Sequence, residues 1–242
     1  MRDKTLLVLG ASSDMGQYLI KKTYKNYKTI IVHYNSNNSF VDDLKKECDA
    51  QIVEYQADFS DSKSTENFVN KLSEGGYSID HVVHFPATVA NPSKFHKNDW
   101  KDYENAINVS LRSVVMVLQS VIKGMLKKKE GKIILMLTSY VNNIPPKYQS
   151  TYVTIKHALL GLVKALAVEY ADKNIQINGV SPEMVETNFL SNLPDFVIEK
   201  NATQQPLGRN LKVDDVIPTI EFLLSSGSDY ITGQNISITG GK

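Results

Sequence analysis

The chain alternates short apolar runs with longer amphipathic runs, and this alternation constrains the fold more than any other feature. The apolar runs have the length and composition of strands, whereas the runs between them have the spacing of helices. The predicted strands are Thr5–Leu9, Thr29–His33, Gln51–Tyr55, His81–Phe85, Lys132–Leu137, Ile175–Val180 and Asn235–Ile238. The first predicted helix starts near Met15, and the others cover Phe40–Cys48, Ser64–Leu72, Trp100–Lys127, Thr151–Tyr170 and Val213–Leu224. Such alternation predicts an α/β fold, a doubly wound parallel sheet of Rossmann type with helices on both faces.

The sequence predicts one domain over residues 1–242. No Pro/Gly/Ser-rich linker interrupts the alternation, and a chain of 242 residues suits one domain with an ample core. Only Thr187–Arg209 lacks a clear periodicity. Long irregular segments in compact domains are often lids over active sites, so we interpret this segment as a flap that closes on ligands. Its apolar residues fit either a substrate-facing surface or packing on the core.

Composition and charge exclude several classes of function. The net charge of +1 provides no field for nucleic acid, and no uninterrupted apolar run reaches the length of a membrane span. Cys48 is the single cysteine, which excludes an internal disulfide and fits a reducing compartment. The first four residues lead directly into an apolar run without a signal-peptide pattern. The single cysteine and the lack of a signal-peptide pattern lead us to expect a cytoplasmic protein. Because the five histidines share no ligand spacing, we expect no metal site.

The spacing of Tyr152 and Lys156 indicates proton-transfer chemistry. In a helix, residues four apart lie on one face, so the phenol and the ammonium would be neighbours. A neighbouring ammonium stabilises a phenolate and lowers the tyrosine pKa toward neutrality. Ser139, thirteen residues before Tyr152, could hold a carbonyl oxygen while the phenol transfers its proton. On its own the pair more often marks a solvated helix face, so its weight depends on the rest of the chain.

The segment from Gly10 to Gly16 is typical of a dinucleotide-binding turn. It joins the first predicted strand to the first helix, where glycines let backbone N–H groups approach a pyrophosphate. The second strand ends near Asn35 and Ser36 without a carboxylate for a ribose 2′-hydroxyl, which favours NADP over NAD. No Arg or Lys stands there to pair with a 2′-phosphate. Asp58 fits either a contact with adenine or a turn or helix cap.

Together these motifs resemble those of the short-chain dehydrogenase/reductase family over nearly the whole chain. Further matching motifs are Ile107–Ser110, Ile177–Pro182, Ile231–Gln234 and the Gly240-Gly241 pair. The resemblance implies four catalytic residues, which are Asn108, Ser139, Tyr152 and Lys156. In this assignment Asn108 holds a water near the lysine. The implied cofactor contacts are Gly10, Ser12, Ser13, Asp14, Met15, Gly16, Asn35, Ser36, Asp58, Phe59, Pro86, Tyr152, Lys156, Pro182, Val185 and Thr187.

The family branch that this chain looks most like contains the 3-oxoacyl-acyl-carrier-protein reductases of fatty acid biosynthesis. The resemblance therefore implies an NADP-dependent reduction of a 3-oxoacyl thioester and a homotetramer built through the two long helices. In that branch basic residues meet the acidic carrier protein, which places a possible docking surface near Lys128, Lys129 and Lys173. A solvated surface is the alternative for these lysines. Alternative functions are a sugar, polyol or small-ketone reductase, or a catalytically weak nucleotide-binding regulator.

Three departures from the family pattern concern the cofactor side of the site. Leu9 and Asp14 stand where the family usually has threonine and a second glycine, and His84–Ala87 replaces an Asn-Asn-Ala-Gly loop. Glu183 replaces the glycine that usually follows the proline. Asp14 places a negative charge near the expected pyrophosphate, which is unfavourable unless its side chain turns away to cap the helix.

Overall fold

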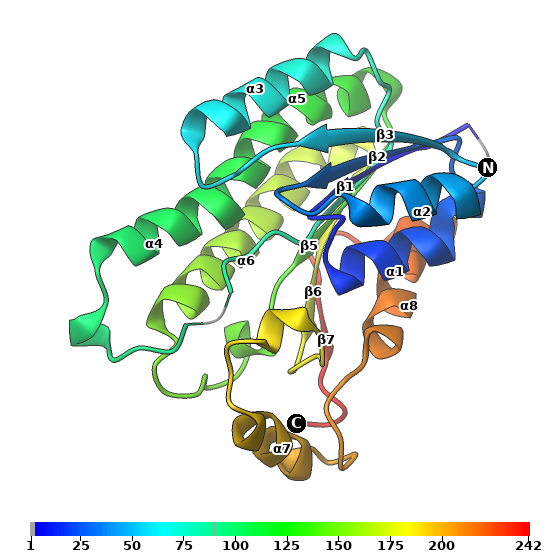
Figure 1. Cartoon of the computed structure of the whole chain (residues 1–242). Helices are drawn as coiled ribbons and strands as arrows, with labels where there is room; N and C mark the ends of the chain where they lie inside the picture. The colour runs from blue at the N-terminus through cyan, green and yellow to red at the C-terminus, as the bar shows by residue number, and fades with distance from the viewer. Residues whose placement is uncertain (1–2, 90) are drawn as a thin grey trace.

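The computed structural model describes residues 3–89 and 91–242, and Figure 1 shows its arrangement. Residues 1 and 2, part of the opening stretch considered above for a signal peptide, lie outside the described part. Within that part seven strands form one sheet: β1 (Thr5–Leu9), β2 (Thr29–Tyr34), β3 (Gln51–Gln56), β4 (His81–His84), β5 (Gly131–Met136), β6 (Ile175–Pro182) and β7 (Asn235–Ile238). Each strand corresponds to a predicted one.

The sheet is parallel throughout, with the strand order β3-β2-β1-β4-β5-β6-β7. This order confirms the predicted doubly wound fold. The direction of winding reverses between β1 and β4, since the chain first proceeds outward to β3 and then returns to β4 on the other side of β1. In open parallel sheets ligands bind beyond the carboxyl ends of the strands at such a reversal.

Helices cover both faces of the sheet (Figure 1). Their bounds are α1 (Asp14–Thr23), α2 (Ser39–Glu47), α3 (Ser62–Glu74), α4 (Trp100–Ala106), α5 (Ser113–Lys128), α6 (Ser150–Tyr170), α7 (Asp195–Gln204) and α8 (Val213–Leu224). Buried side chains of α1, α2 and α8 pack on one face, and those of α3, α5 and α6 pack on the other. The strands supply both cores in alternation, because Leu6 and Val8 face the first layer and Leu7 and Leu9 the second.

The long helices carry more apolar surface than the sheet covers. By length and composition alone, Trp100–Lys128 and Ser150–Lys173 could each cross a membrane, although charged residues interrupt both. Only 44% and 28% of their most apolar windows are buried. The uncovered part forms a groove between α5 and α6, lined among others by Val115, Ile122 and Leu162. A helix that is apolar on two sides needs a second partner.

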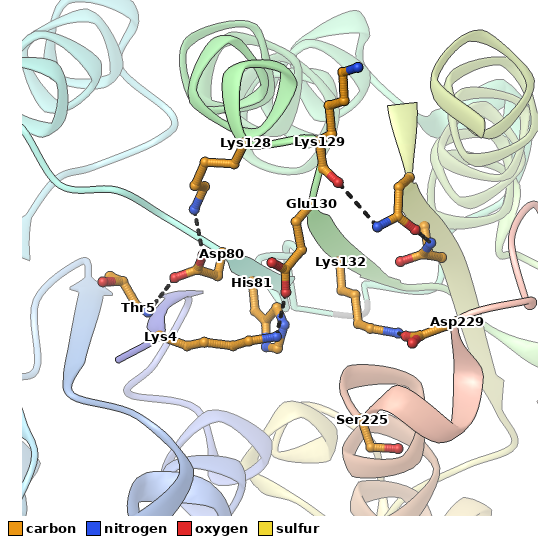
Figure 2. Close-up of polar contacts among 12 residues, drawn as sticks. Lys4, Thr5, Asp80, His81, Lys128, Lys129, Glu130, Lys132, Ser225 and Asp229 are labelled. Atoms are coloured by element: carbon orange, nitrogen blue, oxygen red, sulfur yellow. Dashed lines mark hydrogen bonds and ion pairs between the residues drawn. The ribbon is translucent and has the colours of Figure 1, made fainter. Parts of the chain in front are cut away.

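Polar side chains pair with one another at the amino edge of the sheet (Figure 2). The Lys132 ammonium is buried and lies 2.7 Å from an Asp229 carboxylate oxygen. The buried Asp80 accepts hydrogen bonds from the backbone N–H of Thr5 and from the Lys128 ammonium. Because buried charges are costly unless paired, these contacts explain how this edge tolerates lysine and aspartate.

Candidate active site

A cavity of about 340 Å³ opens at the carboxyl edge of the sheet, beside the reversal between β1 and β4. The glycine loop after β1, the ends of β5 and β6, the start of α6 and the flap all contribute to its wall. Among the described residues, its lining includes Ser12, Ser13, Asp14, Met15, Thr138, Tyr140, Tyr152, Lys156, Pro182, Glu183, Val185, Thr187, Asn188 and Phe189. The structure thus places half of the predicted site residues in the cavity lining, among them the predicted catalytic residues Tyr152 and Lys156.

Tyr152 and Lys156 lie on one face of α6 and both line the cavity. The Lys156 ammonium lies 5.6 Å from the centre of the Tyr152 ring and donates a 2.6 Å hydrogen bond to the carbonyl of Met136. The flap also reaches this position, since the rings of Tyr152 and Phe189 are 6.1 Å apart. The predicted proximity of the phenol and the ammonium is therefore present.

The electrostatics of the pair differ from the prediction. Burial raises the pKa of Tyr152 to about 12, although a hydrogen bond from the Thr138 side chain opposes the rise. Burial also lowers the pKa of Lys156 to about 8. The expected lowering of the tyrosine pKa by the ammonium is wrong for the protein without ligands, because desolvation of the phenolate outweighs the other influences.

Thr138, rather than Ser139, presents its hydroxyl to Tyr152. Thr138 lines the cavity, and its side chain counteracts the rise in the pKa of Tyr152. Ser139 is 1% exposed, is absent from the cavity lining, and its Oγ has no hydrogen-bond partner. The structure therefore corrects the placement of Ser139 in the site.

Strand geometry explains this one-residue correction. Successive side chains of an extended chain point to opposite sides. Leu135 and Leu137 face the layer of α5 and α6, whereas Met136 faces the other layer. Thr138 is extended and continues the side of Met136, so Ser139 falls on the side of Leu137. The alternation of the preceding strand was the signal that could have identified Thr138, and the spacing of thirteen residues concealed it.

Asn108 lies outside the cavity lining, and its role through a bound water stays a prediction. Its amide donates to the carbonyl of Ser60 at 3.4 Å, and its side-chain oxygen accepts from Arg112 at 3.4 Å. Asn108 is absent from the cavity lining, and no hydrogen bond to Lys156 is found among the described residues. A π-helical segment, Ile107–Arg112, joins α4 to α5 here. Its wider turn changes which side chains face α6, a shift that the sequence motif does not reveal.

The glycine loop has the close backbone geometry that a diphosphate requires. Gly10 has φ +73°, and a Cβ on Gly16 would lie 2.7 Å from the carbonyl oxygen of Gly10. The Ser13 hydroxyl caps α1 by accepting a 3.1 Å hydrogen bond from the Gly16 N–H. Buried His33 fixes the start of the loop, since its Nδ1 accepts a 3.1 Å hydrogen bond from the Gly10 N–H. This role of His33 was not predicted.

The remaining predicted cofactor residues lie around this loop but outside the cavity lining. Pro86 packs against Gly10, and buried Phe59 stacks on His33 at 3.9 Å between ring centres. Asp58 uses its carboxylate within a local turn, accepting 2.7 Å and 2.8 Å hydrogen bonds from Ser60. These contacts favour the turn interpretation of Asp58. Exposed positions after β2 are occupied by Asn35 and Ser36.

The end of β6 places Pro182, Val185 and Thr187 in the cavity wall with the unexpected Glu183. Glu183 is buried, and the Lys242 ammonium lies 3.7 Å from its carboxylate. Burial raises the pKa of Tyr140 to about 12, and the charge of Glu183 adds to this rise.

No cluster of three or more His, Cys, Asp or Glu suited to a metal ion occurs within residues 3–89 and 91–242.

The lysines predicted to dock a carrier protein lie near the opposite edge of the sheet. Lys128 binds Asp80 and the Ile79 carbonyl, and Figure 2 shows its side chain directed toward Asp80. Lys173 pairs with Asp172 at 2.5 Å. Because β5 rises by roughly 20 Å over its six residues, these lysines do not border the cavity of their own chain.

A family model described as Enoyl-(Acyl carrier protein) reductase matches residues 10–242. The chain belongs to the short-chain dehydrogenase/reductase family. This short-chain dehydrogenase/reductase is 30% identical over 242 residues to a protein of Buchnera aphidicola named 3-oxoacyl-(acyl-carrier-protein) reductase FabG, covering 98% of this chain and 96% of the relative. A Thermotoga maritima protein of the same name is 30% identical and covers 100% of this chain and 98% of the relative.

Solved structures agree with the family assignment. "ElxO with NADP Bound" has a TM-score of 0.86, is 26% identical and covers 100% of this chain and 98% of its own. A 3-oxoacyl-(acyl-carrier protein) reductase with bound NAD from Brucella melitensis has a TM-score of 0.87 and 20% identity, with 99% and 91% coverage, and shows the shared fold. The short-chain dehydrogenase/reductase is thus an oxidoreductase whose family uses nicotinamide cofactors.

Proposed function

We propose that this protein is an NADP-dependent reductase that converts a 3-oxoacyl thioester, carried by acyl carrier protein, into the 3-hydroxy form in fatty acid biosynthesis. The observation that carries the proposal is the convergence of Thr138, Tyr152 and Lys156 on one cavity beside a glycine loop. The names of the full-length relatives support the substrate class.

The cavity residues fit a dinucleotide. Gly16 packs closely on the backbone of Gly10 and Ala11, which keeps the loop tight, and the N-terminus of α1 in this wall suits a diphosphate. Ser12, Ser13, Val185 and Thr187 line the same wall and would hold the cofactor. NADP is supported over NAD by the absence of a carboxylate at the exposed turn after β2. When bound, the cofactor supplies the hydride.

The protein's own residues would handle the oxygen of the substrate. Thr138 donates a hydrogen bond to the carbonyl, and Tyr152 gives its proton to the oxygen as negative charge develops there. The raised pKa keeps Tyr152 protonated at neutral pH, as a proton donor must be. Lys156, anchored on the Met136 carbonyl, would hold the ribose of the cofactor and stabilise the phenolate that remains.

Matched substitutions of the two adjacent hydroxyl residues test this assignment. Thr138→Val removes the hydroxyl but keeps the shape, and we expect kcat with NADPH and a 3-oxoacyl thioester to fall about 100-fold or more. Ser139→Ala alters a buried hydroxyl off the cavity, and we expect less than about a threefold change. A larger loss in Ser139→Ala than in Thr138→Val would refute the assignment. Turnover of sugars or small ketones alone would refute the substrate class.

A homotetramer in the cytoplasm is the assembly that we propose. The apolar groove between α5 and α6 supports pairing of these helices across a two-fold axis. We propose that the helices pair antiparallel, which would place the amino-edge lysines of one subunit toward the cavity edge of its partner. This arrangement would reconcile carrier docking near Lys129 and Lys173 with their distance from the cavity of their own chain. Light scattering that finds a monomer at micromolar concentration would refute it.

A further inference from the structure

Asp14, the first residue of α1, is hydrogen-bonded to the flap. One carboxylate oxygen accepts a 2.7 Å hydrogen bond from the backbone N–H of Asn188, and the other accepts a 3.1 Å hydrogen bond from the Asn188 side-chain amide. Asn188 begins a short 3-10 turn, Asn188–Leu190, whose preceding residue Thr187 provides no side-chain cap. Asp14 therefore caps the first turn of the flap from 174 positions away in the sequence.

The carboxylate is free for this contact because α1 is capped by another residue. The Ser13 hydroxyl accepts from the Gly16 N–H and donates to the Gly10 carbonyl at 2.8 Å. The expectation that Asp14 turns away to cap its own helix is therefore half right, since the side chain turns away but caps the flap instead. Both Asp14 and Asn188 line the cavity, so the contact lies in the wall where the glycine loop and the flap meet.

A carboxylate at this position would weaken the binding of a dinucleotide. The N–H groups and the dipole at the N-terminus of α1 attract anions, so a released Asp14 carboxylate would compete with the diphosphate for them. Like charges this close repel, so a released carboxylate would also oppose binding of the diphosphate directly. Two hydrogen bonds to Asn188 satisfy the carboxylate on the flap side and hold it away from the loop.

We propose that Asn188 is a positioning residue which, by holding the Asp14 carboxylate away from the diphosphate position, couples the order of the flap to cofactor affinity. The inference rests on the proposed function, because it takes the cavity to bind a nicotinamide dinucleotide. It concerns the two residues of this chain that face each other across the loop and the flap. Asn188 acts on the cofactor through Asp14 and not by touching it.

A double-mutant cycle with Asp14→Gly and Asn188→Ala separates this role from direct contact. NADPH affinity is measured by fluorescence titration of the full-length protein. Asn188→Ala keeps the 2.7 Å backbone hydrogen bond to Asp14 and removes only the 3.1 Å side-chain bond. We therefore expect it to weaken binding about threefold in the parent background and to have no effect in the Asp14→Gly background. Asp14→Gly and the charge-removing Asp14→Asn should each bind NADPH more tightly than the parent. Equal weakening by Asn188→Ala in both backgrounds would show a direct cofactor contact and overturn the proposal.

Hydrogen exchange in the flap gives a second readout that needs no cofactor. Without ligands, we expect peptides covering residues 187–193 to exchange faster in Asp14→Gly and in Asn188→Ala than in the parent, while peptides from α8 stay unchanged. Unaltered exchange in both variants, with normal NADPH binding by the parent, would overturn the coupling but leave the proposed function intact. Failure of the parent to bind either NADPH or NADH would refute both the proposed function and the coupling.

Discussion

Buried histidines make this protein sensitive to acid. Burial lowers the pKa of His33 to about 4 and, together with the nearby Lys4, Lys132 and Lys128, lowers the pKa of His81 to about 3. A histidine in the unfolded chain has a pKa of about 6.5. Below that pH the histidines of the unfolded chain bind protons, whereas the buried histidines of the folded protein stay neutral. The stabilisation that neutral histidine provides is therefore present above about pH 6.5 and is lost as the pH falls toward the folded pKa.

The size of the effect follows from these two pKa values. Between about pH 7.5 and about pH 5, each histidine should lower the free energy of unfolding by about 2 kcal/mol. The two together remove about 4 kcal/mol, a large share of the roughly 5 to 15 kcal/mol that stabilises an ordinary domain. Buried His84, whose pKa also lies well below its usual value because of burial, acts in the same direction.

Denaturant unfolding of matched variants at the two pH values measures this contribution. We expect His33→Gln and His81→Gln each to reduce the difference in unfolding free energy between about pH 7.5 and about pH 5 by about 2 kcal/mol. His157→Gln is the control, because His157 is exposed on α6. Comparing differences cancels the cost of the substitution itself. If His81→Gln keeps the full pH difference of the parent, the reasoning from burial is refuted.

Three further predictions concern chemistry, the glycine loop and the amino edge. Tyr152→Phe should abolish turnover while NADPH affinity in a fluorescence titration stays within about twofold, since only the transferable proton is lost. Gly16→Ala should weaken NADPH binding at least tenfold in the same titration, because its Cβ would meet the Gly10 carbonyl at 2.7 Å. Asp229→Ala should lower the unfolding free energy by about 1 to 3 kcal/mol, because it leaves the buried Lys132 ammonium with less compensation, and Lys132→Met should cost less in the same denaturant assay.

The layout of the fold could be predicted because its determinants are local. Each buried strand is an apolar run of strand length, and the amphipathic runs between strands have helical spacing. The helix in the flap could not be predicted. This helix, α7, lies within the segment predicted to be irregular, and none of the residues of α7 is buried. A helix without a buried face leaves no apolar stripe in the sequence, so periodicity could not reveal it.

The catalytic residues could be predicted only where spacing determines geometry. Tyr152 and Lys156 share a helix, and four residues along a helix is a fixed displacement. Thr138 and Ser139 are adjacent hydroxyl residues, and a shift of one position reverses the side to which an extended residue points. The position of Asn108 outside the cavity lining could not be predicted for a similar reason, because the π-helical turn changes the angular position of every side chain after its start.

Asp14 shows why the effect of a departure from a motif cannot be judged from neighbouring residues. Within its own loop, a carboxylate at the start of α1 is a negative charge close to an expected diphosphate. Its two hydrogen-bond partners belong to Asn188, in the segment with the weakest sequence pattern. Only folding of the whole sheet brings the segment that follows β1 close enough to the segment that follows β6 for this contact. In an isolated loop the Asp14 charge would weaken cofactor binding. In the folded protein the same carboxylate instead accepts two hydrogen bonds from Asn188 of the flap.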